Sequence, residues 1–110
     1  MEEFVVSDLV RSDYVLKAGV LDFDGFVIAA KPDNEQTKEL LSKLAEVHYA
    51  ADDFIQTSII TEKMTIIIHK LAKNYALVIG CDPKSNLGHI RHEIHQAASR
   101  LDGYLNSVQR

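Results

Sequence analysis

Two carboxylates, two residues apart and followed by a glycine, are the residues of this sequence with the most obvious chemical potential. Asp22-Phe23-Asp24-Gly25 lies between the apolar runs Tyr14–Leu21 and Phe26–Ala30. Such a pair could supply a nucleophile and a general acid if its environment kept the two carboxyl groups in different protonation states. An Asp-Gly step between two apolar runs is, however, a strong signal for a β-hairpin, because glycine accepts a positive φ. We therefore expect a hairpin turn here, with catalysis as the less favoured interpretation.

Three histidines recur at intervals of three residues: His89, His92 and His95. On a helix, neighbouring members could share a metal ion, but all three together span roughly 120° of the helix surface. His92 and His95 are also one residue closer than the i, i+4 pair of zinc proteases. We expect a solvent-exposed or partner-facing helix surface, with a metal site or a pH-sensing contact as the less favoured alternatives.

The remaining reactive side chains point to structural roles. Cys81 is the only cysteine, and a lone thiol at a strand end behaves most often as a small buried hydrophobe. His69 is expected on a strand, hydrogen-bonded to a neighbour. The sequence contains no phosphate-binding G-x-x-x-x-G-K-[ST] motif, so the chain is not itself a P-loop nucleotide hydrolase. We predict no catalytic residue, no cofactor and no enzymatic activity.

Composition narrows the class of protein further. The chain has 110 residues, with 12 Lys and Arg against 16 Asp and Glu, giving a formal charge of −4. This length supports one hydrophobic core, so residues 1–110 are interpreted as a single domain. The negative balance argues against nucleic acid as a partner. A single cysteine, an acidic N-terminus and the lack of a long apolar stretch favour a cytoplasmic protein without a membrane span.

The elements that must position these residues follow from hydrophobic periodicity and turn signals. The pattern predicts a short helix over 2–12, a hairpin of strands 14–21 and 26–30, and a long helix over 34–54. Strands are expected at 55–61, 64–71 and 75–81, and a final helix begins after a cap at Ser85 or Asn86. The apolar runs Ile66–Ile68 and Ala76–Ile79 do not alternate with polar residues. They indicate strands buried on both faces, with helices on both sides of the sheet.

The helix over 34–54 carries an unusually wide apolar stripe. Leu40, Leu44 and Val47 form a seam that we expect to face the sheet. Leu41 and His48 lie to one side of that seam, so the stripe is wider than one contact with a sheet requires.

The whole pattern resembles the roadblock/dynein light-chain family. The first matching block is Val15 and Gly19-Val20-Leu21-Asp22, followed by Asp24-Gly25-Phe26-Val27-Ile28-Ala29-Ala30. The second block comprises Tyr75-Ala76-Leu77-Val78-Ile79, Asn86-Leu87-Gly88, Ile90-Arg91, Glu93, Ala97-Ala98 and Leu101. Single motifs are weakly specific, so the joint arrangement from Val15 to Leu101 carries the resemblance.

This resemblance implies an α/β (α+β) domain with the roadblock, profilin-like fold and the order αββαβββα. A five-stranded antiparallel sheet would carry the helix over 34–54 on one face and the two terminal helices on the other. It also implies a homodimer in which the long helices and the third strands of two copies pair. The interface residues expected from this arrangement are Leu41, His48, Ile55 and Ile59.

The function that the resemblance implies is regulatory. A homodimer would bind a small Ras-like GTPase and modulate its nucleotide cycle, without donating a catalytic residue. The first alternative is a passive scaffold or adaptor subunit resembling a dynein light chain. A less favoured alternative is a small phosphatase resembling the haloacid dehalogenases, with Asp22 as nucleophile and Asp24 as general acid.

Overall fold

The computed structural model describes residues 1–50 and 56–107 of the chain, and the structural statements below refer to these residues. The elements follow the order αββαβββα, with one short 3₁₀ turn, η1 (Ala72–Asn74), before the last strand. The helices are α1 (Glu2–Val10), α2 (Glu35–Ala50) and α3 (Leu87–Ser107). The strands are β1 (Val15–Leu21), β2 (Val27–Lys31), β3 (Gln56–Ile60), β4 (Thr65–Lys70) and β5 (Ala76–Cys81).

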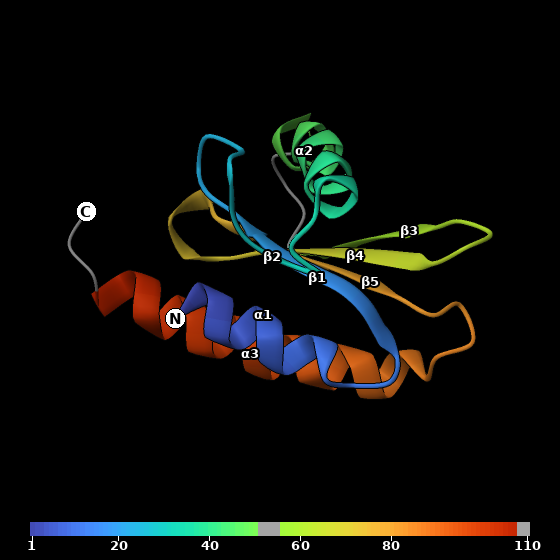
Figure 1. Cartoon of the computed structure of the whole chain (residues 1–110). Helices are drawn as coiled ribbons and strands as arrows, with labels where there is room; N and C mark the ends of the chain where they lie inside the picture. Colours follow the sequence, from blue (N-terminus) through green and yellow to red (C-terminus); the bar gives the residue numbers. More distant parts are fainter. Residues whose placement is uncertain (51–55, 108–110) are drawn as a thin grey trace.

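One antiparallel sheet of five strands, in the order β2-β1-β5-β4-β3, forms the middle of three layers (Figure 1). The helix α2 lies on one face, and α1 and α3 lie side by side on the other. The centre of the sheet joins distant parts of the chain, because β1 pairs with β5 from Lys17↔Gly80 to Leu21↔Ala76. The fold class, the strand count and the placement of the helices are confirmed.

The apolar runs explain why the sheet is covered twice. On the face of α1 and α3, Ile67, Leu77 and Ile79 are buried against residues of both helices. On the opposite face, Ile66 and Val78 are buried in a second cluster that includes residues of α2. Strands that lack polar residues on either face require this arrangement, because each face would otherwise expose apolar surface to water.

Side-chain caps fix the starts of the two long helices. The Oδ1 atom of Asn34 accepts a hydrogen bond from the Thr37 main-chain N–H at 2.9 Å. At α3, the Oδ1 atom of Asn86 accepts from the His89 N–H at 3.2 Å. Of the two caps proposed for the last helix, the structure therefore uses Asn86 for the helix N–H groups.

The helix α1 packs one side against the sheet. Val5, Val6 and Leu9 are buried beneath the sheet, whereas Phe4 is 64% exposed. Phe4 instead packs beside α3, where the guanidinium carbon of Arg100 lies 5.4 Å from its ring centre. No described helix is long and apolar enough to cross a membrane.

Candidate interaction surfaces

The carboxylate of Asp22 organises the turn between β1 and β2. Its Oδ1 atom accepts hydrogen bonds from the main-chain N–H groups of Asp24 at 2.9 Å and Phe26 at 3.0 Å. The turn is completed by Gly25, which has a φ of 87°, a conformation that is unfavourable for residues with a Cβ. The predicted hairpin is confirmed. The antiparallel sheet contradicts the phosphatase alternative, because haloacid dehalogenases use a parallel sheet.

The three histidines of α3 are exposed, as expected. His89 interacts along its own helix, with Nε2 3.3 Å from the Glu93 Oε1 atom, and its ring meets that of Tyr14 edge to face at 6.2 Å. Among the described residues, no group of three or more His, Cys, Asp or Glu side chains is arranged to hold a metal ion.

His69 and Cys81 occupy structural positions. The His69 Nδ1 atom lies 3.2 Å from the Gln56 Nε2 atom on the adjacent strand, which confirms the expected contact with a neighbour. Burial lowers the pKa of His69, while the charge of Asp102 opposes that shift. Cys81 is fully buried, its Sγ donates to the Thr65 carbonyl at 3.3 Å, and burial raises its pKa.

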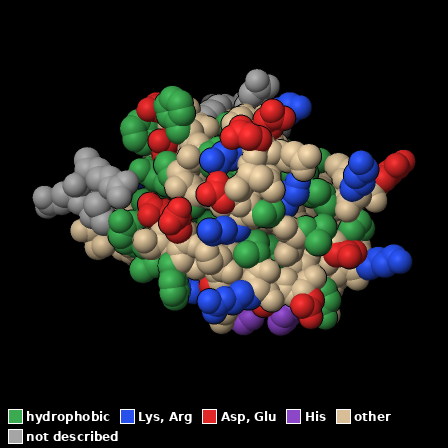
Figure 2. Space-filling model, in the orientation of Figure 1, with side chains coloured by type: hydrophobic (Ala, Val, Ile, Leu, Met, Phe, Trp, Pro, Cys, Tyr) green, Lys and Arg blue, Asp and Glu red, His purple; other side chains and the backbone are tan. Residues whose placement is uncertain are grey.

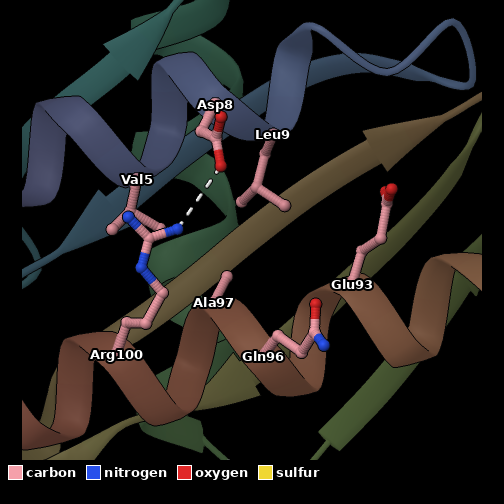
Figure 3. Close-up of a pocket in the computed structure, with 7 residues that line it drawn as sticks. All are labelled: Val5, Asp8, Leu9, Glu93, Gln96, Ala97 and Arg100. Carbon is pink, nitrogen blue, oxygen red and sulfur yellow. Dashed lines mark hydrogen bonds and ion pairs between the residues drawn. The ribbon is translucent and has the colours of Figure 1, made fainter.

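A groove lies between α1 and α3 on the described surface. It has a volume of about 110 Å³ and a floor formed by Val5, Leu9 and Ala97 (Figure 3). The side chains of Glu93 and Gln96 project from α3 and complete the lining of the groove. The small side chain of Ala97 leaves the space between the two helices.

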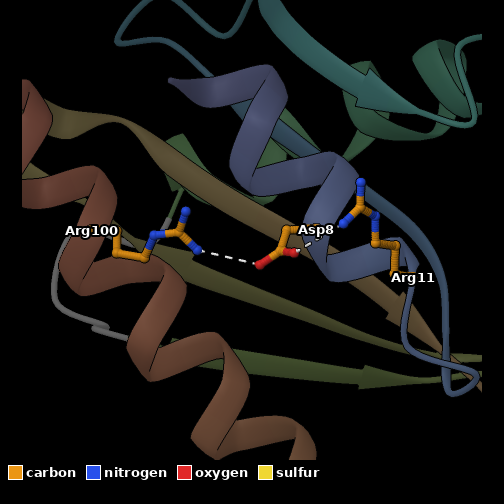
Figure 4. Close-up of polar contacts among 3 residues, drawn as sticks. All are labelled: Asp8, Arg11 and Arg100. Carbon is orange, nitrogen blue, oxygen red and sulfur yellow. Dashed lines mark hydrogen bonds and ion pairs between the residues drawn. The ribbon is translucent and has the colours of Figure 1, made fainter.

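An ion pair closes one end of this groove. The Arg100 Nη1 atom lies 3.3 Å from the Asp8 Oδ2 atom, and the Arg11 Nη1 atom lies 3.9 Å from Asp8 Oδ1 (Figure 4). The first and last helices are thus joined by charge as well as by packing. Pattern reasoning missed this pair, because the two residues are far apart in the sequence and neither has a distinctive local motif.

The side of α2 that packs on the sheet differs from the side that the sequence predicts. Leu41 is 2% exposed and lies in the core beside Leu44 and Ala45. A Cβ at Gly19 of β1 would meet the Leu41 Cδ1 atom, so Leu41 points directly onto the sheet. The prediction that Leu41 faces a partner helix is wrong. The prediction for Leu44 is confirmed, and Leu40 is half-buried at the margin of the core.

The outer edge of β3 is the other surface, besides α2, at which we expect a dimer interface. Ile59 is half-buried and packs against the core on the α2 side, whereas Ile60 is 76% exposed. The β3–β4 hairpin extends beyond the helices at one side of the molecule (Figure 1). The side chain of His48 and the whole of Ile55 lie outside the described residues.

Charged side chains of both signs are interspersed over the face of the molecule shown in Figure 2. Acidic and basic groups adjoin one another there, and that face carries no broad basic stripe of the kind that follows a phosphate backbone.

Comparison with known families matches residues 1–90 to the Roadblock/LC7 domain. The chain belongs to the Roadblock/LC7 domain family. No curated protein sequence matches it.

Solved structures share the architecture of this roadblock domain at low sequence identity. MglB from Myxococcus xanthus is 20% identical, with a TM-score of 0.85, over 96% of this chain and 95% of that one. A Roadblock/LC7 domain from Streptomyces avermitilis is 13% identical, with a TM-score of 0.84, over 94% and 96%. Profilin IB from Acanthamoeba castellanii is 18% identical, with a TM-score of 0.69, over 94% and 98%. The roadblock domain therefore has the profilin-like fold.

Proposed function

We propose that this chain is a cytoplasmic roadblock module that forms a homodimer and, as a dimer, binds a small Ras-like GTPase and modulates its nucleotide cycle. The observation that carries the proposal is membership of the Roadblock/LC7 family over most of the chain. Prokaryotic members of that family are associated with small Ras-like GTPases. The proposal treats residues 1–110 as one domain that acts as a regulator and not as an enzyme.

The proposed dimer uses the β3 edge. An edge strand with main-chain groups available for pairing and a large exposed apolar side chain, Ile60, favours association with a second strand. A self-complementary interface about a two-fold axis is the commonest way to cover such a surface. Ile59 is proposed to contribute beside that edge, together with His48 and Ile55, whose roles remain predictions. Leu41 is not included, because its side chain lies in the core of its own protomer.

The proposed mechanism is a shift in the conformation of the GTPase, without a donated catalytic residue. No arginine is assigned a catalytic role, and Arg11 and Arg100 are engaged with Asp8 on the α1–α3 side. A regulator of this kind acts by binding one conformation of the GTPase switch regions more tightly than another.

Two measurements on the purified chain test the proposal. Light scattering at tens of micromolar protein should give the mass of a dimer, and a monomer would contradict the proposed assembly. The chain is then added to a Ras-like GTPase encoded next to its gene, and phosphate release is followed. A changed hydrolysis rate supports regulation. Binding with an unchanged rate supports the passive scaffold, and no binding contradicts both.

A further inference from the structure

The edge of the sheet opposite β3 is formed by β2, and it has a different environment. In the described structure β2 pairs only with β1, from Ala18↔Lys31 to Leu21↔Val27. Its outer side therefore presents main-chain groups that no described strand uses. Such groups can be satisfied by water, or by an extended chain that adds to the sheet.

A helix packs against each face of the sheet at this edge. The helix α1 packs against β2 on one face of the sheet, and α2 packs against it on the other. In Figure 1, β2 runs between α1 and α2. A hollow of about 150 Å³ lies along the strand, lined by four consecutive β2 residues and by three charged residues. The lining residues are Val27, Ile28, Ala29, Ala30, Glu3, Asp33 and Lys38.

The small residues of β2 shape the hollow into a slot beside its main chain. Ala29 and Ala30 are 4% and 8% exposed, yet both line the hollow. Their methyl groups pack into the two opposite cores, so the main chain forms much of the wall. A groove that follows the backbone of one strand has the form needed for an added strand.

The charges at the two walls differ. On the α2 side, the Lys38 Nζ atom lies 3.2 Å from the Asp33 Oδ1 atom, so these charges already compensate each other. On the α1 side, Glu3 is exposed and forms no ion pair with another described residue. In an extended chain alternate side chains point to opposite faces, so one face of an incoming strand would meet Glu3. A Lys or Arg on that face would be complementary.

We propose that this slot binds an extended, basic segment of a protein partner as a sixth strand of the sheet, with a Lys or Arg facing α1. A second copy of this chain fits less well. Pairing two β2 edges about a two-fold axis would bring together two copies of α1, each with the exposed Glu3. The site is separate from the proposed dimer surface, because β2 and β3 are opposite edges of the sheet.

The test uses a designed peptide, acetyl-Thr-Lys-Val-Lys-Val-Lys-Thr-amide, added to the nitrogen-15-labelled full chain. Saturable shifts of amide signals from Val27–Lys31 are expected. Hydrogen exchange of outward-pointing N–H groups in β2 should slow, because those groups gain a partner. The same peptide methylated on its main-chain nitrogens should lose these effects, since it cannot complete the strand ladder.

Charge reversal tests the orientation. Glu3 is exposed, so Glu3→Lys should fold normally and bind the lysine peptide about 1.5- to 5-fold more weakly, the range for one exposed ion pair. It should bind the matched peptide with Glu in place of Lys more tightly than the wild type does. A charge-neutral control, Gln36→Ser on an exposed part of α2, should change neither affinity.

Three outcomes would overturn the proposal. They are the absence of shifts in β2 at millimolar peptide, shifts confined to β3 at the other edge, and equal binding of the methylated peptide. The first and third outcomes do not bear on dimerisation or on a GTPase, so failure there is distinguishable from failure of the proposed function. Shifts confined to β3 would mean that the peptide pairs with the proposed dimer edge instead, and the mass measured by light scattering tests that dimer separately.

Discussion

At the scale of single residues, side chains with reactive potential serve the fold of this protein. The Asp22 carboxylate accepts hydrogen bonds from two main-chain N–H groups of its own turn. The Cys81 thiol donates a hydrogen bond to a main-chain carbonyl on a neighbouring strand. Hydrogen bonding of this kind removes the cost of burying or constraining polar groups. The residue types alone could not distinguish this use from catalysis, whereas the glycine and the flanking apolar runs could.

The buried thiol leads to the first prediction. Burial raises the pKa of Cys81, and the charge of Asp82 raises it further. The thiolate is the reactive form, so iodoacetamide at about pH 8 should leave the native protein unmodified over hours. In denaturant, mass spectrometry should show one modification per chain, because Cys81 is the only cysteine. Rapid stoichiometric labelling of the native protein would contradict this expectation.

His69 predicts a specific dependence of stability on pH. Burial lowers the pKa of His69 below its ordinary value of about 6.5. The charge of Asp102 opposes this shift, and His95 adds to it. As the pH falls through about 6.5, the unfolded chain binds a proton that the folded chain resists, so the free energy of unfolding decreases. Between about pH 7.5 and 5.5, the melting temperature of His69→Gln should fall less than that of the wild type. Equal losses would show that other groups control the transition.

At the scale of elements, the contact between α2 and β1 depends on a missing side chain. A Cβ at Gly19 would overlap the Leu41 Cδ1 atom and lie 3.0 Å from the Ala29 carbonyl oxygen. Gly19→Ala should therefore lower the free energy of unfolding by about 1–3 kcal/mol, and Leu41→Ala should lower it by about 2–5 kcal/mol. In denaturant titrations, the double variant should lose less than the sum, because the shortened residue 41 makes room.

A second glycine variant, Gly80→Ala, is the matched control. It shows how much stability is lost when any glycine of a strand is replaced by alanine. A Cβ at Gly80 would meet the Met64 Sδ atom at 2.9 Å, and a methionine side chain can move. Gly80→Ala should therefore cost less than Gly19→Ala. An additive double variant, or the reverse order of the two glycine variants, would contradict the proposed packing of Leu41 on Gly19.

Sequence reasoning found the elements, and its error on α2 has an identifiable cause. The buried stripe of this helix includes Thr37, which is fully buried although its Oγ1 atom has no hydrogen-bond partner in the described structure. A pattern based on apolar residues alone omits threonine, so it predicts a buried stripe centred too close to Leu40. With Thr37 included, Leu41 and Ala45 fall on the inner side and need no partner helix to cover them.

The sheet was more predictable than the helices that cover it. Uninterrupted apolar runs and the Asp-Gly turn are local signals, and they located the strands to within about one residue of their structural bounds. The side chains at helix–helix contacts depend on distant neighbours. Phe4 is an example, because its environment is determined by Arg100 on the last helix, and nothing near Phe4 in the sequence indicates that contact.

At the scale of the whole molecule, the proposed dimer can be weakened without touching the core. Ile60 is 76% exposed on the β3 edge, so Ile60→Lys should leave the melting temperature of the protomer nearly unchanged. It should raise the dimer dissociation constant about tenfold, equivalent to about 1.4 kcal/mol of lost contact. Sedimentation equilibrium measures this constant.

Phe26→Lys provides the matched control. Phe26 is 68% exposed at the β1–β2 turn, near the opposite edge of the sheet, and its replacement should leave the dimer intact. An unchanged dissociation constant for Ile60→Lys, or an equal effect of both variants, would exclude the β3 edge as the specific interface. The sequence alone could nominate this edge through the family resemblance, but it could not show which apolar side chain there remains exposed.

The pairing of β1 with β5 has a consequence for how this protein is made. The strand β1 (Val15–Leu21) has its central neighbour at Ala76–Cys81, so most of the chain must leave the ribosome before the two can meet. Contacts between distant segments slow folding, because the intervening loop must close first. A nascent chain that stops before β5 would carry the N-terminal helix and both strands of the first hairpin without the core that buries them. Synthesis of the last third of the chain is therefore the step that commits this protein to its native state.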